Sequence, residues 1–303
     1  MKRIISLVLL ACFLAPHLAF AGAWTVPQKQ MWSQYTVKWN WAKSQFDNHG
    51  KKDRYPSDSR SWGWSMGPEM HVGITDWLNV FWLMEYKEGW WKEYARPTLP
   101  GWGPGSSKNH GITNIDIGTK IRFMEAPVVL SGQVKYSIWN PDYEDHALED
   151  RAEQPGLSDR SNGLELRLLM GKYFGTKIPF YWGGETGYRW NNHALCNQIP
   201  FFTEIGFWPT KWLLIKSEID GYWTHDNTGD VRKSYAIWRI GPVIQLMTIY
   251  HLWRGVNVTA KEFTSDVTRA SKSLNLEVQY GNTFWGENTA AAQECVLKVS
   301  TQF

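Results

Sequence analysis

The chain has 303 residues, among them 20 Trp, 13 Tyr and 13 Phe, and its 32 Lys and Arg nearly balance its 29 Asp and Glu. A net charge of +3 leaves no basic excess of the kind that nucleic-acid binding needs. The mean hydropathy of −0.42 does not exclude a membrane β-barrel, because every second residue of a barrel strand faces the lumen. Abundant Trp and Tyr favour such a barrel, with its aromatic girdles, over an exported β-sandwich with an aromatic core.

The first 21 residues have the form of a cleaved signal peptide. Residues 1–3 are basic, residues 4–14 are mostly apolar, and residues 19–21, Ala-Phe-Ala, match the small-x-small site of a signal peptidase. The sequence therefore predicts cleavage after Ala21 and a mature barrel of residues 22–303. No later apolar run reaches the ~18 residues of a membrane-spanning helix, so export ends in the periplasm, the outer membrane or the medium.

Along the mature chain, apolar and polar side chains alternate in short segments, as in strands with one face toward lipid and the other toward water. The segments number about twelve, the size of a small outer-membrane barrel. The last one ends on Phe303 and resembles the closing strand of such a barrel. The predicted strands, in chain order, are 34–41, 62–72, 78–86, 115–123, 130–138, 164–170, 182–190, 203–207, 213–219, 238–246, 274–280 and 294–303.

Long and short connections alternate between these segments, as outer loops and inner turns do in outer-membrane barrels. Residues 44–61, 88–110 and 140–162 predict long loops. Both chain ends of such a barrel lie on the periplasmic side, so the number of strands must be even. Residues 249–273 do not fit a single crossing. They extend the preceding strand, form an element on the inner side, or hide two short strands that would raise the count to about fourteen.

Six motifs occur in the order seen in a family of outer-membrane channels associated with the meta-pathway of phenol degradation. They lie at residues 22–27, 46–50, 73–78, 116–123, 164–169 and 187–190. The similarity runs from Gly22 to about Leu246 and resumes at Ser273, whereas residues 249–272 depart from it. The resemblance implies an all-β, antiparallel up-and-down barrel of about twelve strands with a transport role. A phenolic cargo would follow from the family's name alone.

If the apolar faces point to lipid, the charged residues of the strands point into the lumen. Both signs are represented about equally, so no anion or cation preference is expected. One hypothesis is a charged eyelet that a polar or amphipathic solute passes. The other is a lumen plugged by salt bridges. The lumen residues predicted to form the solute path are Glu85, Asp116, Lys120, Arg122, Glu165, Arg167, Glu185, Arg189, Glu218 and Arg239.

Tryptophans mark the predicted long loop of residues 88–110. Trp90, Trp91 and Trp102 stand among glycines and prolines there. Such side chains could stack on an aromatic solute as a gate, or belong to the outer aromatic girdle. A gate predicts higher conductance when residues 90–105 are deleted.

Catalysis is not expected. Ser161-Asn162-Gly163 resembles part of the His-x-Ser-Asn-Gly run of outer-membrane phospholipases, but Asp159 stands where the histidine base would be. An outer-membrane lipase is therefore the least favoured alternative. No metal-ligand spacing or cofactor motif occurs. The mature cysteines, Cys196 and Cys295, allow a disulfide in an oxidising compartment, whereas a free Cys295 on the apolar face is equally compatible with the pattern.

The sequence thus predicts a channel in the outer membrane of a Gram-negative-type bacterium. It would pass small molecules passively, aromatic or amphipathic ones among them. The alternative function is a plugged structural or adhesin-like barrel. The expected partners are outer-membrane lipid and lipopolysaccharide, the barrel-assembly machinery and a small solute.

Overall fold

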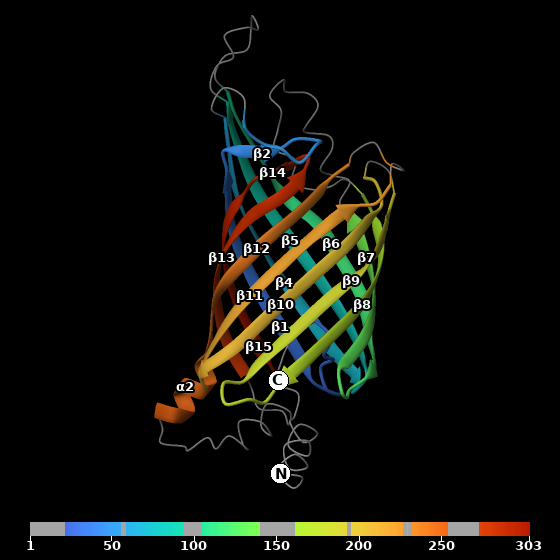
Figure 1. Ribbon diagram of the computed structural model, residues 1–303, viewed down its shortest axis with the longest axis vertical. Helices are drawn as coiled ribbons and strands as arrows, with labels where there is room; N and C mark the ends of the chain where they lie inside the picture. Colours follow the sequence, from blue (N-terminus) through green and yellow to red (C-terminus); the bar gives the residue numbers. More distant parts are fainter. Residues whose placement is uncertain are drawn as a thin grey trace, which may run out of the picture.

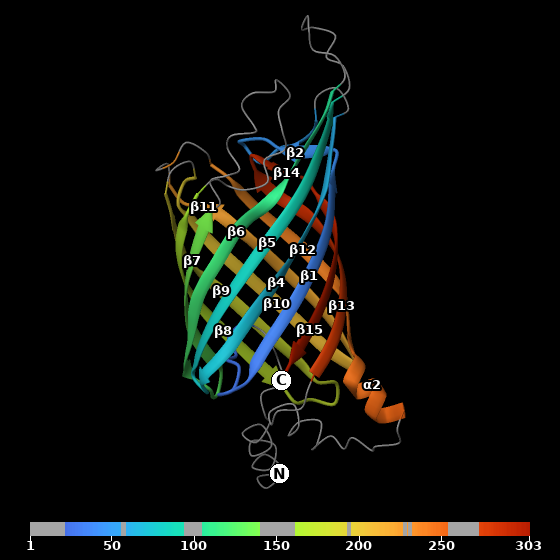
Figure 2. The same ribbon diagram turned by 180° about the vertical axis from the view of Figure 1, so that it is seen from behind.

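The computed structural model describes residues 22–55, 59–93, 105–139, 161–192, 195–226, 229, 232–253 and 273–303. These residues form a closed antiparallel barrel of twelve strands, which confirms the predicted fold and strand number (Figures 1 and 2). The predicted signal peptide, residues 1–21, lies outside the described residues. The barrel strands are β1 (Met31–Ala42), β4 (Arg60–Thr75), β5 (Leu78–Glu93), β6 (Gly105–Met124), β7 (Val129–Trp139), β8 (Gly163–Phe174), β9 (Phe180–Asn191), β10 (Gln198–Thr210), β11 (Leu213–Thr224), β12 (Ser234–Gln245), β13 (Ser273–Glu287) and β15 (Gln293–Gln302).

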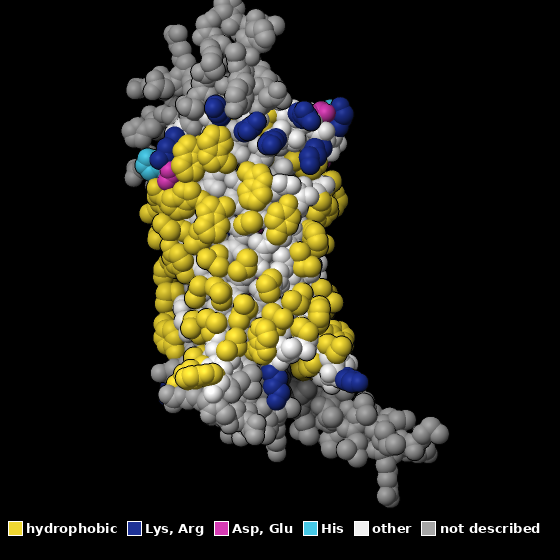
Figure 3. Space-filling model, turned by 90° about the vertical axis from the view of Figure 1, so that its left-hand side faces the viewer, with side chains coloured by type: hydrophobic (Ala, Val, Ile, Leu, Met, Phe, Trp, Pro, Cys, Tyr) yellow, Lys and Arg dark blue, Asp and Glu magenta, His cyan; other side chains and the backbone are white. Residues whose placement is uncertain are grey.

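The strands sort their side chains by face. On β8, Leu166 and Leu168 are exposed on the outside, whereas Glu165 is completely buried in the barrel. Figure 3 shows the result on one face of the wall as an apolar band, with Lys and Arg gathered at the rims. Alternation with a period of two produces this arrangement wherever the outside is lipid and the inside is polar.

The barrel closes between its first and last strands. β1 pairs with β15 from Trp32 opposite Gln302 to Trp41 opposite Gln293. At the inner end the backbones of Met31 and Phe303 exchange two hydrogen bonds, of 2.8 and 3.0 Å. The alternating segment that ends on Phe303 is therefore the closing strand, as predicted.

The region after β12 resolves the question of strand parity. A helix, α2 (Leu246–Trp253), follows β12 directly and lies at the same end of the barrel as Phe303 (Figure 1). Leu246, predicted as the end of a strand, therefore begins a helix. The alternative of about fourteen strands is wrong, because twelve described strands already close the barrel. Residues 254–272 lie outside the described residues. No helix in the described part of the chain is long and apolar enough to cross a membrane.

A small sheet stands at the opposite end of the barrel. It consists of β2 (Ser44–Phe46), β3 (Lys52–Arg54) and β14 (Thr289–Ala290), in the order β14-β2-β3. The predicted loop 44–61 thus contains two short strands. Between them, Asp47 accepts backbone hydrogen bonds from His49 and Lys51, each 2.8 Å, and Gly50 adopts a φ of 76°. Glycine tolerates this left-handed conformation without a steric penalty, so the turn is well specified by its sequence.

Deleting Phe303 should lower the stability of the closed barrel. The deletion removes the two terminal backbone hydrogen bonds of the seam, each of which contributes about 0.5–1.5 kcal/mol. We expect the folded gel band to disappear at a lower temperature than for the unaltered protein. Phe303→Leu keeps the backbone and is the matched control. Equal melting of the deletion variant and the unaltered protein would contradict a role for this terminal pair.

Candidate functional site

Charged side chains of β6 to β9 meet inside the barrel. Lys135 lies 3.3 Å from Asp116 and 3.2 Å from Glu165, and Arg167 lies 2.5 Å from Glu165 and 3.0 Å from Glu185. We call these five residues the first cluster. Strand register brings them together, since Lys135 is the direct cross-strand partner of Glu165. Such partners hold their Cβ atoms about 5 Å apart on the same face.

A second cluster lies on the wall formed by β11, β12, β13 and β15. Lys216 contacts Glu218 at 3.2 Å and Glu277 at 2.7 Å, Arg239 contacts Glu218 at 3.1 Å, and Lys298 contacts Glu277 at 3.1 Å. Register again explains the pairs, because Glu218 is opposite Arg239 and Glu277 is opposite Lys298. Charges of both signs are paired in each cluster. The margin of the second cluster is formed by Glu204, Asp220 and Glu294.

Most of the predicted lumen residues belong to these clusters, and the others lie elsewhere on the inner wall. Glu85 lies 3.6 Å from Lys38 and 3.1 Å from Lys87. Lys120 is buried beside Glu69 and lines a cavity. Glu85 therefore has its own pair of cations, on β1 and β5, between the strands of the two clusters.

Arg122 and Arg189 are the remaining predicted lumen residues. Arg122 pairs with Glu125 at 3.7 Å, next to the turn between β6 and β7. The guanidinium of Arg189 lies 5.5 Å from the centre of the Tyr222 ring, which is a cation–π distance. Arg189 is also the direct cross-strand partner of Glu165 and therefore borders the first cluster.

The segment before β1, Gly22–Gln30, lies across the inner end of the lumen, and we call it the N-terminal segment. Ala23 is buried against Val129 and Leu169, and its carbonyl accepts a hydrogen bond from the Ser131 hydroxyl. The Thr25 hydroxyl donates a 2.6 Å hydrogen bond to the carbonyl of Asp76. These contacts fix the segment to several strands of the wall.

Trp24 is the largest side chain of the N-terminal segment. It packs against two separate clusters of buried apolar side chains at the inner end of the barrel. A Cβ built on Gly171 would lie 2.2 Å from the Trp24 ring, so only glycine leaves room for the ring there. The indole Nε1 is buried without a hydrogen-bond partner among the described residues. The sequence marks this segment as the motif of residues 22–27 but does not predict its place in the lumen. Trp24 and Val26, apolar residues outside any alternating segment, could have indicated burial.

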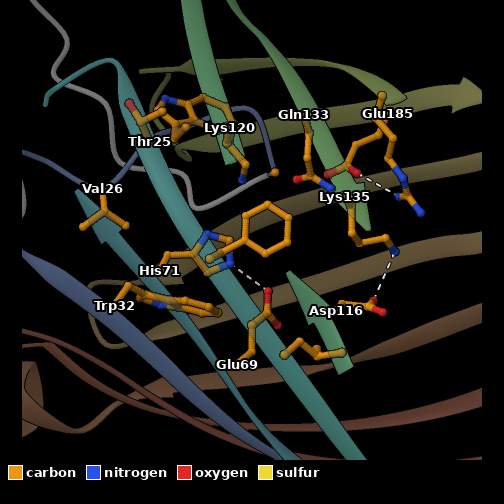
Figure 4. A pocket seen from close by; sticks show the side chains of 15 residues that line it. Thr25, Val26, Trp32, Glu69, His71, Asp116, Lys120, Gln133, Lys135 and Glu185 are labelled. Carbon is orange, nitrogen blue, oxygen red and sulfur yellow. Dashed lines mark hydrogen bonds and ion pairs between the residues drawn. The ribbon is translucent and has the colours of Figure 1, made fainter. Parts of the chain in front are cut away.

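Two cavities remain between the N-terminal segment and the clusters. The inner one has a volume of about 270 Å³ and is lined by Trp24, Trp32 and Phe81 together with charged groups. Figure 4 shows Trp32 in this space with Glu69, Lys120 and Glu185. In it, His71 and Glu69 are hydrogen-bonded at 2.8 Å. The second cavity, of about 230 Å³, is lined by Lys38, Glu85, Glu218, Arg239 and Lys298, among others. Glu69 and Leu83 line both cavities, so the two spaces are neighbours within the lumen.

The predicted gating loop is largely a strand. β5 continues to Glu93 and β6 begins at Gly105, so Trp90 is opposite Lys108 and Trp91 is opposite Ser107. The expectation of a loop from residue 88 to 110 is therefore wrong, because the hairpin extends well past the apolar band. Trp102 lies outside the described residues.

Trp90 and Trp91 have different surroundings, because neighbours in a strand face opposite sides. The ring of Trp90 is stacked on that of Trp62, with centroids 6.2 Å apart, on the outer face of the wall. The ring of Trp91 meets the buried Tyr55 edge-on at 4.7 Å on the inner side. Only Trp91 therefore lies at the mouth of the lumen.

Of the two alternatives that the sequence leaves open for Cys196 and Cys295, the structure has the free thiols rather than the disulfide. Cys196 precedes β10 and its thiol donates to the Gly229 carbonyl at 3.3 Å, whereas Cys295 lies on β15. Strands β11, β12 and β13 separate the two along the wall. Neighbouring strands are about 4.8 Å apart and a disulfide needs Cα atoms within about 7 Å, so this separation explains why the bond is not formed.

Ser161 is buried and has no base beside it among the described residues. Its hydroxyl donates to the backbone carbonyls of Asn162 and Asn192. His146, which could supply a base only through its loop, lies outside the described residues. In the part of the chain that is described, no group of three His, Cys, Asp or Glu side chains is placed to hold a metal ion.

Comparison with known proteins supports the fold. No family model and no curated protein sequence matches the chain. Among solved structures, the COG4313 outer membrane channel from Pseudomonas putida F1 has a TM-score of 0.60 and 12% identity over 95% of this chain and 100% of that one. The translocator domain of the autotransporter NalP from Neisseria meningitidis has a TM-score of 0.45 and 8% identity over 100% of this chain and 94% of that one. At this identity the first likeness shows the fold alone, that of an outer-membrane β-barrel.

Removing the carboxylate at the centre of the first cluster should destabilise the barrel. Glu165→Ala removes the carboxylate that Lys135 and Arg167 share and leaves them Asp116 and Glu185 as partners, and loss of a buried hydrogen bond to a charged group typically costs about 1.5–3 kcal/mol. Asp53→Ala, which breaks an exposed pair with Lys51, should cost less than about 1 kcal/mol. Urea-induced unfolding in lipid vesicles measures both. Similar small losses for the two variants would contradict a structural role for the cluster.

Proposed function

We propose that the protein is an outer-membrane channel that passively passes small molecules. The observation that carries the proposal is the pair of neighbouring cavities inside the wall, which share Glu69 and Leu83. If the side chains in the lumen served only to support the barrel wall, adjoining cavities lined by charged groups would not be needed. The apolar outer band and the likeness in fold to an outer-membrane channel support a location in the outer membrane.

The lining of the inner cavity favours small amphipathic or aromatic solutes. His71 lies edge-on to Trp32 at 5.2 Å and stacked on Phe81 at 5.0 Å, so rings already pack well in this space. Lys120 and Glu69 supply opposite charges nearby. Because charges of both signs line the path, we expect little preference between anions and cations. Phenolic compounds are solutes of this kind. The resemblance of the sequence to channels associated with phenol degradation supports the same class of solute.

The N-terminal segment would act as the inner gate. Its path across the inner end narrows the way from the cavities to the periplasm, and Trp24 fills much of the remaining space. Cleavage after Ala21 would place a positive α-amino group on Gly22. A Cβ built there would lie 1.6 Å from Glu185 Oε1, so the new charge would lie within about 4 Å of that carboxylate. Such an ion pair would hold the gate closed between passages.

A plugged structural barrel is the second candidate. The two clusters of ion pairs favour it, since they join neighbouring and next-neighbouring strands inside the lumen, and charged side chains of this kind can fill a narrow barrel. In that case neither ions nor solutes would cross. Assembly by the barrel-assembly machinery and contact with outer-membrane lipid are expected for both candidates.

Trp24→Ala should widen the inner end of the channel. We expect the unaltered protein in planar bilayers to have measurable single-channel conductance, and the variant to have a higher one because the ring that fills the inner end is removed. Liposome swelling with small sugars should accelerate in parallel. Trp77→Ala, at an exposed position of the inner turn, is the control and should leave both unchanged. A complete lack of conductance and swelling in both variants and the unaltered protein would favour the plugged barrel.

The outer mouth can be tested with two neighbouring tryptophans. Trp91→Ala should raise conductance because the ring faces the mouth beside Tyr55. Trp90→Ala should leave conductance unchanged because that ring lies on the outer face against Trp62. The same single-channel recordings measure both variants. An equal effect of the two substitutions, or no effect of Trp91→Ala, would rule out a gate at this position.

A further inference from the structure

Large apolar side chains form a stripe along helix α2. Leu246, Ile249, Tyr250 and Trp253 stand at positions i, i+3, i+4 and i+7, which share one face of an α-helix. All four are exposed, and Trp253 at the end of the helix is 81% exposed. We call these four residues the helix stripe. A helix on the surface of a water-soluble protein turns such a face toward the core, whereas α2 turns it outward.

The other side of α2 is polar and is directed toward the barrel. Thr248 lies across the helix from the stripe, and its hydroxyl donates a 3.4 Å hydrogen bond to the side chain of Gln245. Gln245 is opposite Asn275 on the inward face of β12 and β13. The eight residues of α2 include no Asp, Glu, Lys or Arg. The helix is therefore amphipathic in the sense opposite to that of a helix surrounded by water.

The helix stripe continues the lipid-facing surface of the barrel. Ile240 is exposed on the outer face of β12, and Ile244 lies opposite Leu276 of β13 on that face. Leu246 is the next outward position in the period of two. Figures 1 and 2 show that α2 leaves the wall here and projects away from the lumen. The apolar surface thus extends without a break from the last strand residues onto the helix.

The position of α2 indicates what covers the stripe. The helix lies at the end of the barrel that carries the chain terminus and the short turns, which is the periplasmic end of an outer-membrane barrel. Tyr and Trp prefer the level at which acyl chains meet headgroups, because each has an apolar ring and one polar group. Tyr250 and Trp253 supply both. We propose that α2 is an interfacial helix that inserts the helix stripe into the inner leaflet, with phospholipid as its partner.

Phospholipid suits the stripe better than a protein partner does. Lipid already covers the outer face of β12 up to Leu246, so a protein on the stripe would have to displace it. Interfacial helices bury their apolar face about 5–10 Å into the boundary between headgroups and acyl chains. A helix of this length, about 12 Å, can lie within that boundary. The stripe is outside the wall, so the proposal does not depend on whether the lumen conducts.

Fluorescent labels on single cysteines test the proposal in phospholipid vesicles. Cys196 and Cys295 are first replaced by serine, since both are free. Ile249→Cys and Trp253→Cys then place an environment-sensitive dye at two positions of the stripe. Because the stripe lies among the upper acyl chains, we expect blue-shifted emission at both positions. We also expect strong quenching by phospholipids that carry a nitroxide near the headgroup, and weak quenching by iodide from the water.

Two further labels provide the controls. Thr248→Cys places the dye on the other side of the same helix, and it should be quenched less by the nitroxide lipid than the stripe labels are. Lys177→Cys places the dye on an exposed position of the turn between β8 and β9, and it should be quenched more by iodide. Heat-modifiable gel migration confirms that each variant is folded.

Three outcomes would overturn the proposal. Iodide could quench the stripe labels as strongly as the label at position 177, which would place the stripe in water. The nitroxide lipid could quench both sides of α2 equally, which would mean that the helix has no lipid-facing side. The stripe labels could be protected from both quenchers, or lose their protection when the protein is diluted in lipid. Protein, from the chain itself or from a second copy, would then cover the stripe.

Discussion

Every other feature of this protein depends on the pairing of its strands. The backbone of a strand inside lipid cannot form hydrogen bonds with water, so it must form them with a neighbouring strand on each side. Only a closed barrel gives every strand two neighbours. Closure fixes the register, and the register fixes which residues meet. A slip of one residue would turn Glu165 toward lipid and Leu166 into the lumen, so the sequence tolerates one alignment only.

The parts of the fold that could be predicted from the sequence are those encoded by a local period. The number of strands and the facing of Leu166, Glu165 and their equivalents follow from alternation, and the structure confirms both. Beyond the apolar band the alternation is lost, because adjacent tryptophans place apolar side chains on both faces of β5. For that reason the upper parts of β5 and β6 read as a loop, and the placement of Trp90 and Trp91 on opposite faces became evident only from the register.

Contacts between residues that are far apart in the chain could not be predicted from the sequence. The N-terminal segment has no alternation, and the glycine that accommodates Trp24, Gly171, is far away along the chain. The meeting of Lys216 with Glu277 likewise depends on which strands become neighbours. Helix α2 was missed because its apolar residues continue those of β12 without a break. The paired charges leave the lumen polar, with both signs represented on its wall.

The small sheet of β2, β3 and β14 joins the two ends of the chain a second time. β14 precedes the last strand and β2 follows the first, and they pair at Thr289 opposite Phe46 and Ala290 opposite Gln45. The seam between β1 and β15 is thus fastened at its outer end by this sheet and at its inner end by Met31 and Phe303. Because contacts hold the seam at both ends, β1 and β15 cannot separate unless the contacts at both ends are broken. Sideways release of a molecule from the lumen into the bilayer would therefore need to occur at some other pair of strands.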